Sequence, residues 1–298
     1  MAPMRTSIEK ATLPVLRVAG VAISHPERRI EVAPGHTKLD VVRYHERMAA
    51  WVLPELAPRP ISVVSFDQAR SREDGKHVHH RREEDDDVGG TFVRVSDIAD
   101  VVRIVQNGSC EFQTWGASFP RLERPDRITL DIDPDPALPW RTVQDAAHHA
   151  RSLLESLGLG AFAKTTGSRG LHIVVPITRR HSWTEVRVFA QGISEELERR
   201  DPTLFTSLAG EERRGRVQLG YARNADGSSA IAAYSLRARA GLPVSMPIAW
   251  SDLENGNRPH FDIESAAAAV AGRTSDPWAA YDRSRQTISG AMRRAVGI

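Results

Sequence analysis

Apolar residues recur at helical spacing in six stretches of the chain. The clearest pattern follows a capping-box-like start at Thr37 to Asp40 and runs through Val41, Tyr44 and Trp51, which predicts an amphipathic helix. The other helices are expected over residues 96–105, 139–157, 183–199, 263–270 and 287–296.

Shorter apolar runs between these stretches predict strands. They lie at residues 60–66, 110–116, 128–133, 171–176 and 216–224, with a strand and turn over 232–239 and short strands around a turn inside 21–30. Residues 201–215 have no such run and are expected to form a loop. The nearby Arg213, Arg214 and Arg216 indicate either a nucleic-acid patch or a solvated turn. Strands that alternate with helices predict the α/β (α+β) class.

Two carboxylates interrupt the strand expected at 128–133. Because side chains alternate along a strand, Asp131 and Asp133 share one face, about 6–7 Å apart, while Leu130 and Ile132 face the core. Like charges so close repel each other unless a cation lies between them, and hard ions such as Mn2+ and Mg2+ take carboxylate oxygens. The alternative is a solvated strand end with turn-forming Asp and Pro.

A glycine-rich turn follows about thirty residues later, at 164–172. Glycines allow backbone N–H groups to approach phosphate oxygens, and Ser168, Arg169 and His172 can each donate a hydrogen bond to them. The alternative is a plain hairpin with a solvated arginine and a strand histidine that has its own partner. The turn therefore indicates a phosphate site only together with the acid pair.

Composition narrows the choice of partners. Basic and acidic residues number 40 and 38, a formal net charge of +2, so a nucleic-acid surface must be a local patch. The single Cys110 excludes an intramolecular disulfide. No signal peptide or apolar run of membrane-spanning length is visible, so a cytoplasmic protein with no membrane partner is expected.

Three strings of this sequence together resemble a known family: LDIDPDPALPW, KTTGSRGLHIVVP and AAYSLRARAGLPVSMPIAW. They are similar to the polymerase domain of bacterial DNA ligase D, in the archaeo-eukaryotic primase superfamily. The resemblance implies a metal-dependent nucleotidyl transferase that uses NTP or dNTP to fill gaps and extend DNA ends in non-homologous end joining. It also implies one primase-polymerase domain over 19–298, mostly antiparallel sheets flanked by helices, after a flexible N-terminus at 1–18.

The resemblance also implies roles for individual residues. A lysine in the first turn of a helix is unfavourable for the helix dipole, which suggests that Lys38 binds an anion. The alternative interpretation, a solvated Lys38 side chain without a ligand, is therefore the less favoured of the two. The implied metal ligands and catalytic residues are Asp131 and Asp133; the nucleotide-binding residues are Ser168, Arg169, His172 and Arg237; the DNA 5′-phosphate residues are Arg28 and Lys38.

Three positions depart from the family pattern. Gln113 stands where the family has a histidine, and glutamine cannot carry a proton at neutral pH. Gly220 stands where the family has its third aspartate and offers no ligand. His77 to Arg81 replaces an aromatic pair that would stack on a base, and its three histidines lack the further ligands that a metal site needs.

These departures leave three hypotheses. The leading one is a protein that binds DNA ends and nucleotide with Mn2+ or Mg2+, with weak or absent transfer. The second is a working polymerase that recruits another ligand, and the third is a scaffold at DNA ends without nucleotide affinity. Since no ligase segment is visible in the sequence, a DNA ligase and an end-binding protein are expected as partners in trans.

Overall fold

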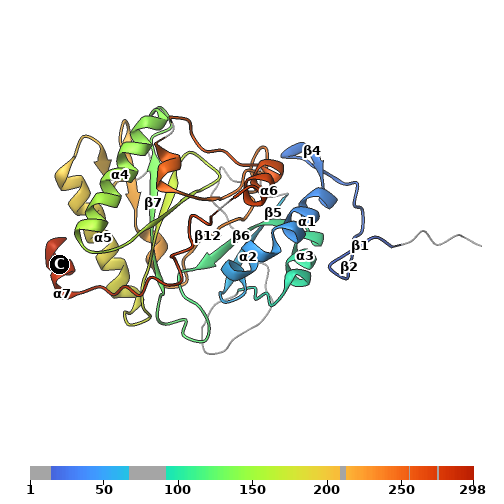
Figure 1. Cartoon of the computed structure of the whole chain (residues 1–298), viewed down its shortest axis with the longest axis horizontal. Helices are drawn as coiled ribbons and strands as arrows, with labels where there is room; N and C mark the ends of the chain where they lie inside the picture. Colours follow the sequence, from blue (N-terminus) through green and yellow to red (C-terminus); the bar gives the residue numbers. More distant parts are fainter. Residues whose placement is uncertain (1–14, 67–91, 209–212, 255, 274) are drawn as a thin grey trace, which may run out of the picture.

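The computed structural model describes residues 15–66, 92–208, 213–254, 256–273 and 275–298. The described residues form two main sheets side by side, each with its own helices and its own apolar core (Figure 1), and two further sheets of two short strands each. All strand pairs but one are antiparallel, so the mixed α/β class with mostly antiparallel sheets flanked by helices is confirmed.

The larger sheet has six strands, with β7 (Arg127–Pro134) near its centre. In spatial order it contains β10 (Phe205–Thr206), β11 (Val217–Gly220), β7, β9 (Leu171–Pro176), β8 (Phe162–Thr165) and β13 (Pro247–Ile248). Only β10 and β11 run parallel. Two long helices, α4 (Trp140–Ser156) and α5 (Trp183–Arg200), supply most of the apolar side chains that cover it.

Side-chain alternation along β7 divides the sheet into an apolar and a polar face. Ile128, Leu130 and Ile132 are fully buried in the core formed with α4 and α5. Arg127, Thr129, Asp131 and Asp133 point the other way, and their exposure increases towards the end of the strand. The polar face therefore carries both acids at its more open end.

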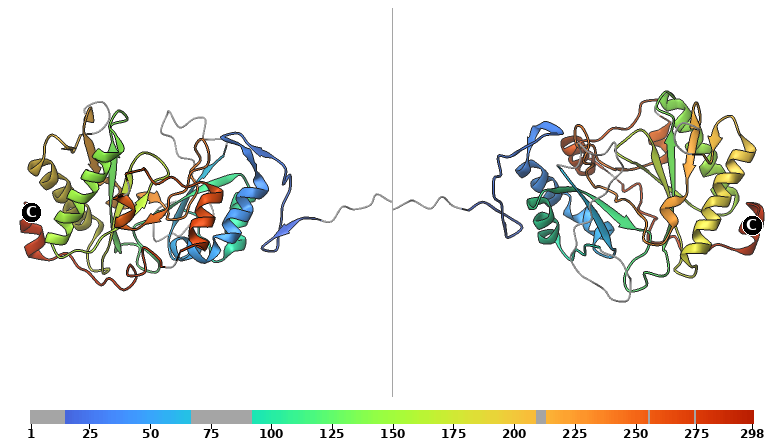
Figure 2. Two further views of the ribbon diagram at one scale, coloured as in Figure 1. Left: turned by 45° about the horizontal axis from the view of Figure 1, so that its top comes forward. Right: turned by 180° about the vertical axis from the view of Figure 1, so that it is seen from behind.

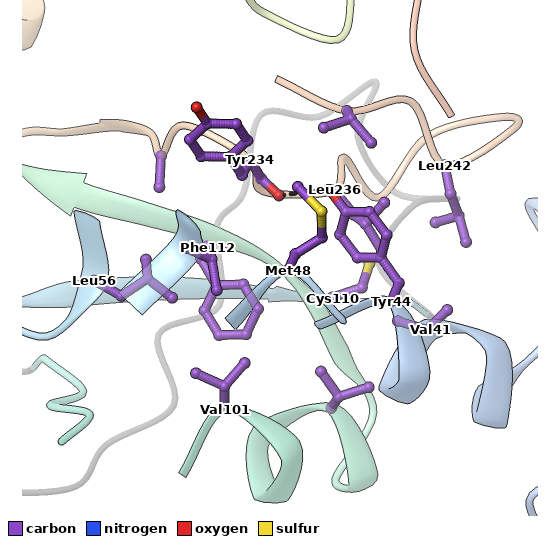
Figure 3. Packing of buried hydrophobic residues seen from close by; sticks show 14 of the residues in the cluster. Val41, Tyr44, Met48, Leu56, Val101, Cys110, Phe112, Tyr234, Leu236 and Leu242 are labelled. Carbon is purple, nitrogen blue, oxygen red and sulfur yellow. Dashed lines mark hydrogen bonds between the residues drawn. The ribbon is translucent and has the colours of Figure 1, made fainter. Parts of the chain in front are cut away.

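The smaller sheet has the order β12 (Ser229–Ile231), β6 (Ser109–Trp115) and β5 (Ile61–Ser65). Its core includes Val41 and Tyr44, with Phe112 of β6 and the loop residue Leu236 (Figure 3). Tyr44 donates a hydrogen bond to the carbonyl oxygen of Tyr234. The helices on this sheet are α1 (Lys38–Arg47), α2 (Ala49–Leu56), α3 (Ile98–Gln106) and α6 (Ile263–Ala271).

The remaining short elements lie outside the two main sheets, as the two further views show (Figure 2). They are β1 (Arg17–Val18), β2 (Val21–Ala22), β3 (Arg29–Ile30), β4 (Ala33–Thr37), the 3-10 turns η4 (Ala222–Asn224) and η5 (Trp250–Leu253), and α7 (Gly290–Ala295). Within the residues that the structure describes, no helix is both long and apolar enough to span a bilayer.

Buried ion pairs join the two layers. Arg127 of β7 donates to Glu55 of α2 at 2.9 Å, and Arg59 donates to Asp126 at 2.7 Å. All four side chains are at least 85% buried. Burial would raise the pKa of both carboxyls, but the two guanidinium groups hold those pKa values below their usual range.

The structure corrects several local predictions. The strands expected inside 21–30 do not pair with each other, since β2 pairs with β1 and β3 with β4. The loop expected at 201–215 contains β10, which is only two residues long and leaves too weak a pattern to detect. The strand expected at 232–239 is wrong, because β12 ends at Ile231 and only a single bridge joins Leu236 to Val244.

Part of the expected flexible N-terminus, residues 1–14, lies outside the described residues. Arg17 and Val18, which were included in that expectation, form β1. The division of the chain into 1–18 and a single domain over 19–298 stays a prediction.

Candidate nucleotide and DNA-end site

Four residues form a row across the polar face of the larger sheet. The strand registers place Lys164 of β8 opposite His172 of β9, His172 opposite Asp131 of β7, and Asp131 opposite Gly220 of β11. The His172 Nε2 atom lies 3.5 Å from Oδ1 of Asp131. The acid pair is therefore adjacent to the glycine-rich turn that precedes β9, as the sequence motifs imply.

The row has a defined charge pattern at neutral pH. Burial would raise the pKa of Asp131, but His172 and Arg223 lower it to about 2. Burial and, to a smaller extent, the neighbouring Lys164 lower the pKa of His172 to about 4, although Asp131 opposes this shift. Burial also brings the pKa of Lys164 down to about 7. Asp131 is thus ionised beside a neutral imidazole.

Two arginines approach the acid pair from the side of β11. Arg213 pairs with Asp133, and Nε of Arg223 lies 3.8 Å from Oδ2 of Asp131. The sequence left the arginines near 213 open between a nucleic-acid patch and a solvated turn. The contact with Asp133 places Arg213, 19% exposed, against the candidate metal ligands instead.

The turn between β8 and β9 depends on two glycines. A Cβ atom on Gly170 would lie 1.9 Å from the carbonyl oxygen of Ile132, so only glycine allows the turn to press against β7. Gly167 has a φ of +66°, in the left-handed region that favours glycine. The loop that carries Arg237 packs on the same turn, because Nη1 of Arg237 donates to the carbonyl oxygen of Thr166 at 3.1 Å.

The predicted nucleotide residues lie around this turn. Ser168 accepts a hydrogen bond from Nη1 of Arg239 at 2.8 Å, and Arg169 is exposed to solvent. His172 is buried at the start of β9 and Arg237 is 12% exposed. The structure thus brings together Ser168, His172 and Arg237, with Arg169 at the rim.

Gln113 and Gly220, two of the positions that depart from the family pattern, lie beside Asp131 or close to it. Gln113 is 7% exposed and lines a cavity of about 260 Å³ together with Arg223, Ser62 and Ser229. At Gly220, a Cβ atom would contact Asp131 at 3.4 Å or more, so space for a side chain exists. Among the described residues, no group of three His, Cys, Asp or Glu side chains could hold a metal ion.

Arg28 and Lys38 lie together at the N-terminus of α1. The backbone N–H of Lys38 donates to the carbonyl oxygen of Arg28 at 2.8 Å, and both residues line a small depression with Phe66 and Gly108. Lys38 is only 5% exposed, so the alternative of a solvated lysine is wrong. Burial and the nearby Arg28 lower the pKa of Lys38.

Sequence reasoning missed three side chains of this region. The sequence analysis gave no role to Lys164, Arg223 or Glu111. The strand register places Lys164 in the row with His172 and Asp131, and Arg223 lies in η4, directly after β11. Apolar alternation does not give this register, because every residue of β9 is buried. The segment from His77 to Arg81 lies outside the described residues.

The fold and site define a class of α/β proteins in which an acidic pair on a central strand faces a glycine-rich turn lined with cationic side chains. Comparison with known proteins identifies the family. A family model described as the LigD primase-polymerase domain matches residues 37–278, and the chain belongs to this family. The resemblance seen in the sequence is therefore confirmed.

Curated relatives agree with this assignment. The multifunctional non-homologous end joining protein LigD of Pseudomonas aeruginosa is 41% identical over 294 residues, 94% of this chain and 35% of the relative. The corresponding protein of Mycolicibacterium smegmatis is 24% identical over 266 residues, 83% of this chain and 34% of the relative. The chain thus spans about a third of the length of these relatives and is homologous to the polymerase domain of LigD.

A solved structure supports the fold. The polymerase domain of Mycobacterium tuberculosis ligase D, in complex with DNA, superposes with a TM-score of 0.77 at 23% identity. The match covers 89% of this chain and 99% of that domain. The primase-polymerase fold is therefore confirmed.

Proposed function

We propose that this chain binds DNA ends and a nucleoside triphosphate in non-homologous end joining, with weak or lost nucleotidyl transfer. The observation that carries the proposal is the row in which ionised Asp131 has His172 on one side and Gly220 on the other. The side towards the turn offers groups for phosphates, whereas on the side towards β11 no described residue completes a group of three side chains that could hold a metal ion.

The carboxylates suit one divalent ion better than two. Asp131 and Asp133 point from the same face of β7 and keep 23% and 48% of their side-chain surface exposed. We assign Mn2+ or Mg2+ to this pair, with its other ligands from phosphate oxygens and water. A bound ion would neutralise phosphate charge and hold the triphosphate. A second ion, near an attacking hydroxyl, would lack the anchor that an acid at position 220 would supply.

Side chains around the turn would bind the phosphates. Arg237 and Arg169 can donate charge-assisted hydrogen bonds to phosphate oxygens, and Ser168 can donate through its hydroxyl group. His172, neutral at pH 7, is in contact with Asp131 and would hold that carboxylate towards the ion. Gln113 could bind through its amide but could not transfer a proton.

Primer extension on a gapped duplex with a 5′-phosphate and Mn2+ tests the proposal. Trace incorporation or none is expected from the native chain, together with nucleotide binding in calorimetry that depends on the metal. Asp131→Ala should abolish that binding. Robust incorporation that disappears in Asp131→Ala would favour the working polymerase, whereas absence of nucleotide binding would favour the scaffold without nucleotide affinity.

The depression beside α1 is proposed to bind the 5′-phosphate at a DNA gap. Two cations meet there at a helix N-terminus, whose free N–H groups favour anions. Lys38→Ala should weaken binding to 5′-phosphorylated gapped DNA by about tenfold, as expected for loss of one hydrogen bond to a charged group, while binding to the 5′-hydroxyl duplex stays unchanged.

Arg43→Ala provides the matched control for Lys38→Ala. It removes an equal charge from an exposed position of the same helix. Fluorescence anisotropy with the two duplexes measures the preference of each variant. An equal loss for both duplexes in Lys38→Ala would remove the assignment of this residue to the 5′-phosphate.

The partners proposed in trans are a DNA ligase and an end-binding protein, which would seal and present the ends that this chain binds. A cytoplasmic location, with access to bacterial DNA, belongs to the same proposal. Co-purification with DNA-end complexes that contain a ligase would test it.

A further inference from the structure

Glu111 is a fully buried carboxylate on β6, with no exposed surface. An ionised carboxylate is expensive to bury unless several donors compensate for its lost hydration. Neither the acid row nor the 5′-phosphate depression includes it. Its partners therefore indicate what the buried charge is for.

Two hydrogen-bond donors and one guanidinium group surround this carboxylate. Nε of Arg237 lies 3.2 Å from Oε2, and the backbone N–H of Ala238 donates to the same oxygen at 3.0 Å. Nε2 of Gln113 donates to Oε1 at 2.8 Å. Glu111 thus links the loop that carries the triphosphate-binding candidate to the strand that carries the glutamine.

The contact with Glu111 holds one side of the Arg237 guanidinium, and the turn holds the other. Nη1 of Arg237 donates to the carbonyl oxygen of Thr166, and a Cβ atom on Gly167 would lie 2.6 Å from Cγ of Arg237. The arginine side chain therefore lies closely against the turn. A guanidinium group binds phosphate oxygens well only in a fixed orientation, because its donors form a planar fork.

The same carboxylate orients the amide of Gln113. Because Nε2 of Gln113 faces Glu111, its Oε1 atom faces Ser229, which donates to it at 3.1 Å. Gln113 and Ser229 both line the cavity beside the acid row. The buried Glu111 therefore fixes the orientation of two side chains, Arg237 beside the turn and Gln113 beside the cavity.

We infer that Glu111 is a positioning residue that orients Arg237 for the phosphates of a nucleoside triphosphate and fixes the amide of Gln113. This role rests on the proposed function. Glu111 itself touches no ligand, because it is completely buried, and we infer that it acts through Arg237 and Gln113.

Glu111→Gln tests this role because it keeps the size of the side chain but changes the hydrogen bonds that the side chain can form. The carboxylate accepts hydrogen bonds on both oxygens and pairs with a guanidinium group, whereas glutamine is uncharged, has a single acceptor oxygen and places its amide N–H groups against a donor. The Arg237 side chain should then leave its position. We expect the dissociation constant for GTP with Mn2+, measured by calorimetry, to rise about tenfold, with the constant for GMP nearly unchanged.

Glu111→Asp separates position from charge. The shorter side chain keeps the negative charge but withdraws it from Arg237 and Gln113, so GTP binding should weaken here as well. If Glu111→Gln does not fold, Glu111→Asp and the double variant E111Q/R237Q, which replaces the buried ion pair by two neutral amides, still give the measurement. The double variant should bind GTP no more weakly than Arg237→Gln alone.

Glu55→Gln is the matched structural control. It removes a carboxylate that is paired with a buried arginine elsewhere in the chain. It should lower stability but leave the ratio of GTP to GMP affinity unchanged. A loss that is equal for both nucleotides in Glu111→Gln, or additive with Arg237→Gln, would show that Glu111 only supports the fold.

Two further outcomes overturn the role in different ways. Tighter GTP binding by Glu111→Gln would mean that Glu111 repels phosphate instead of orienting its partner. If the native chain binds no triphosphate, the proposed function fails and this role falls with it. If the native chain binds GTP and both Glu111 variants bind it equally well, only the role of Glu111 fails.

Discussion

Gly220→Asp is expected to raise nucleotide incorporation on a gapped duplex by roughly 10- to 100-fold, the range that loss of a residue supporting a metal site usually spans. Position 220 lies directly opposite Asp131 on the neighbouring antiparallel strand, with room for a Cβ atom. A third carboxylate there would give a second ion an anionic ligand that no described residue of the native chain supplies. Primer extension with Mn2+ measures the effect.

Gly220→Asn is the control for this gain. Asparagine has nearly the shape of aspartate but no charge, so it should leave incorporation at the level of the native chain. Gly220→Asp combined with Asp131→Ala should lose the gain completely. Equal activity of the Asp and Asn variants would show that the missing carboxylate does not limit transfer.

Gly170→Ala is expected to destabilise the protein by roughly 3 kcal/mol or more, because the added methyl group would overlap the carbonyl oxygen of Ile132. The turn would have to move away from β7, and the contact between His172 and Asp131 would be lost with it. Urea unfolding at neutral pH measures the change in the free energy of unfolding.

Gly35→Ala is the matched control for that substitution. A Cβ atom on Gly35 would have no neighbouring heavy atom within 4 Å, and this glycine does not have a left-handed φ. Its replacement should change the free energy of unfolding by well under 1 kcal/mol. Similar effects at both positions would show that the close approach at Gly170 does not govern stability.

Most of the main helices were predictable because they bury an apolar stripe and several have a local start signal. The helix predicted from Thr37 through Trp51 is divided at Met48 into α1 and α2. Thr37 and Ser182 both cap their helices with the reciprocal hydrogen bonds of a capping box. The short elements were not predictable, because two-residue strands such as β10 carry no periodicity. The bridge at Leu236 is set by tertiary contacts with the loop at Val244, which local sequence does not encode.

The candidate site was also predictable only in part. Alternation along one strand placed Asp131 and Asp133 on a common face, and glycine chemistry identified the turn. The row that joins Lys164, His172 and Asp131 required strand order and register, which depend on pairing between distant segments. The partners of Glu111 come from the loop around residue 237 and could only be found in three dimensions.

The two buried ion pairs between the sheets limit how far the protein can change shape when it binds a ligand. An apolar contact allows small translations, since its buried area changes little as surfaces slide. The bonds from Arg59 and Arg127 to Asp126 and Glu55 are directional, and a shift of about 1 Å would break them. The two ion pairs therefore oppose sliding of one sheet past the other, so the two layers are expected to keep their relative position when the protein binds a ligand.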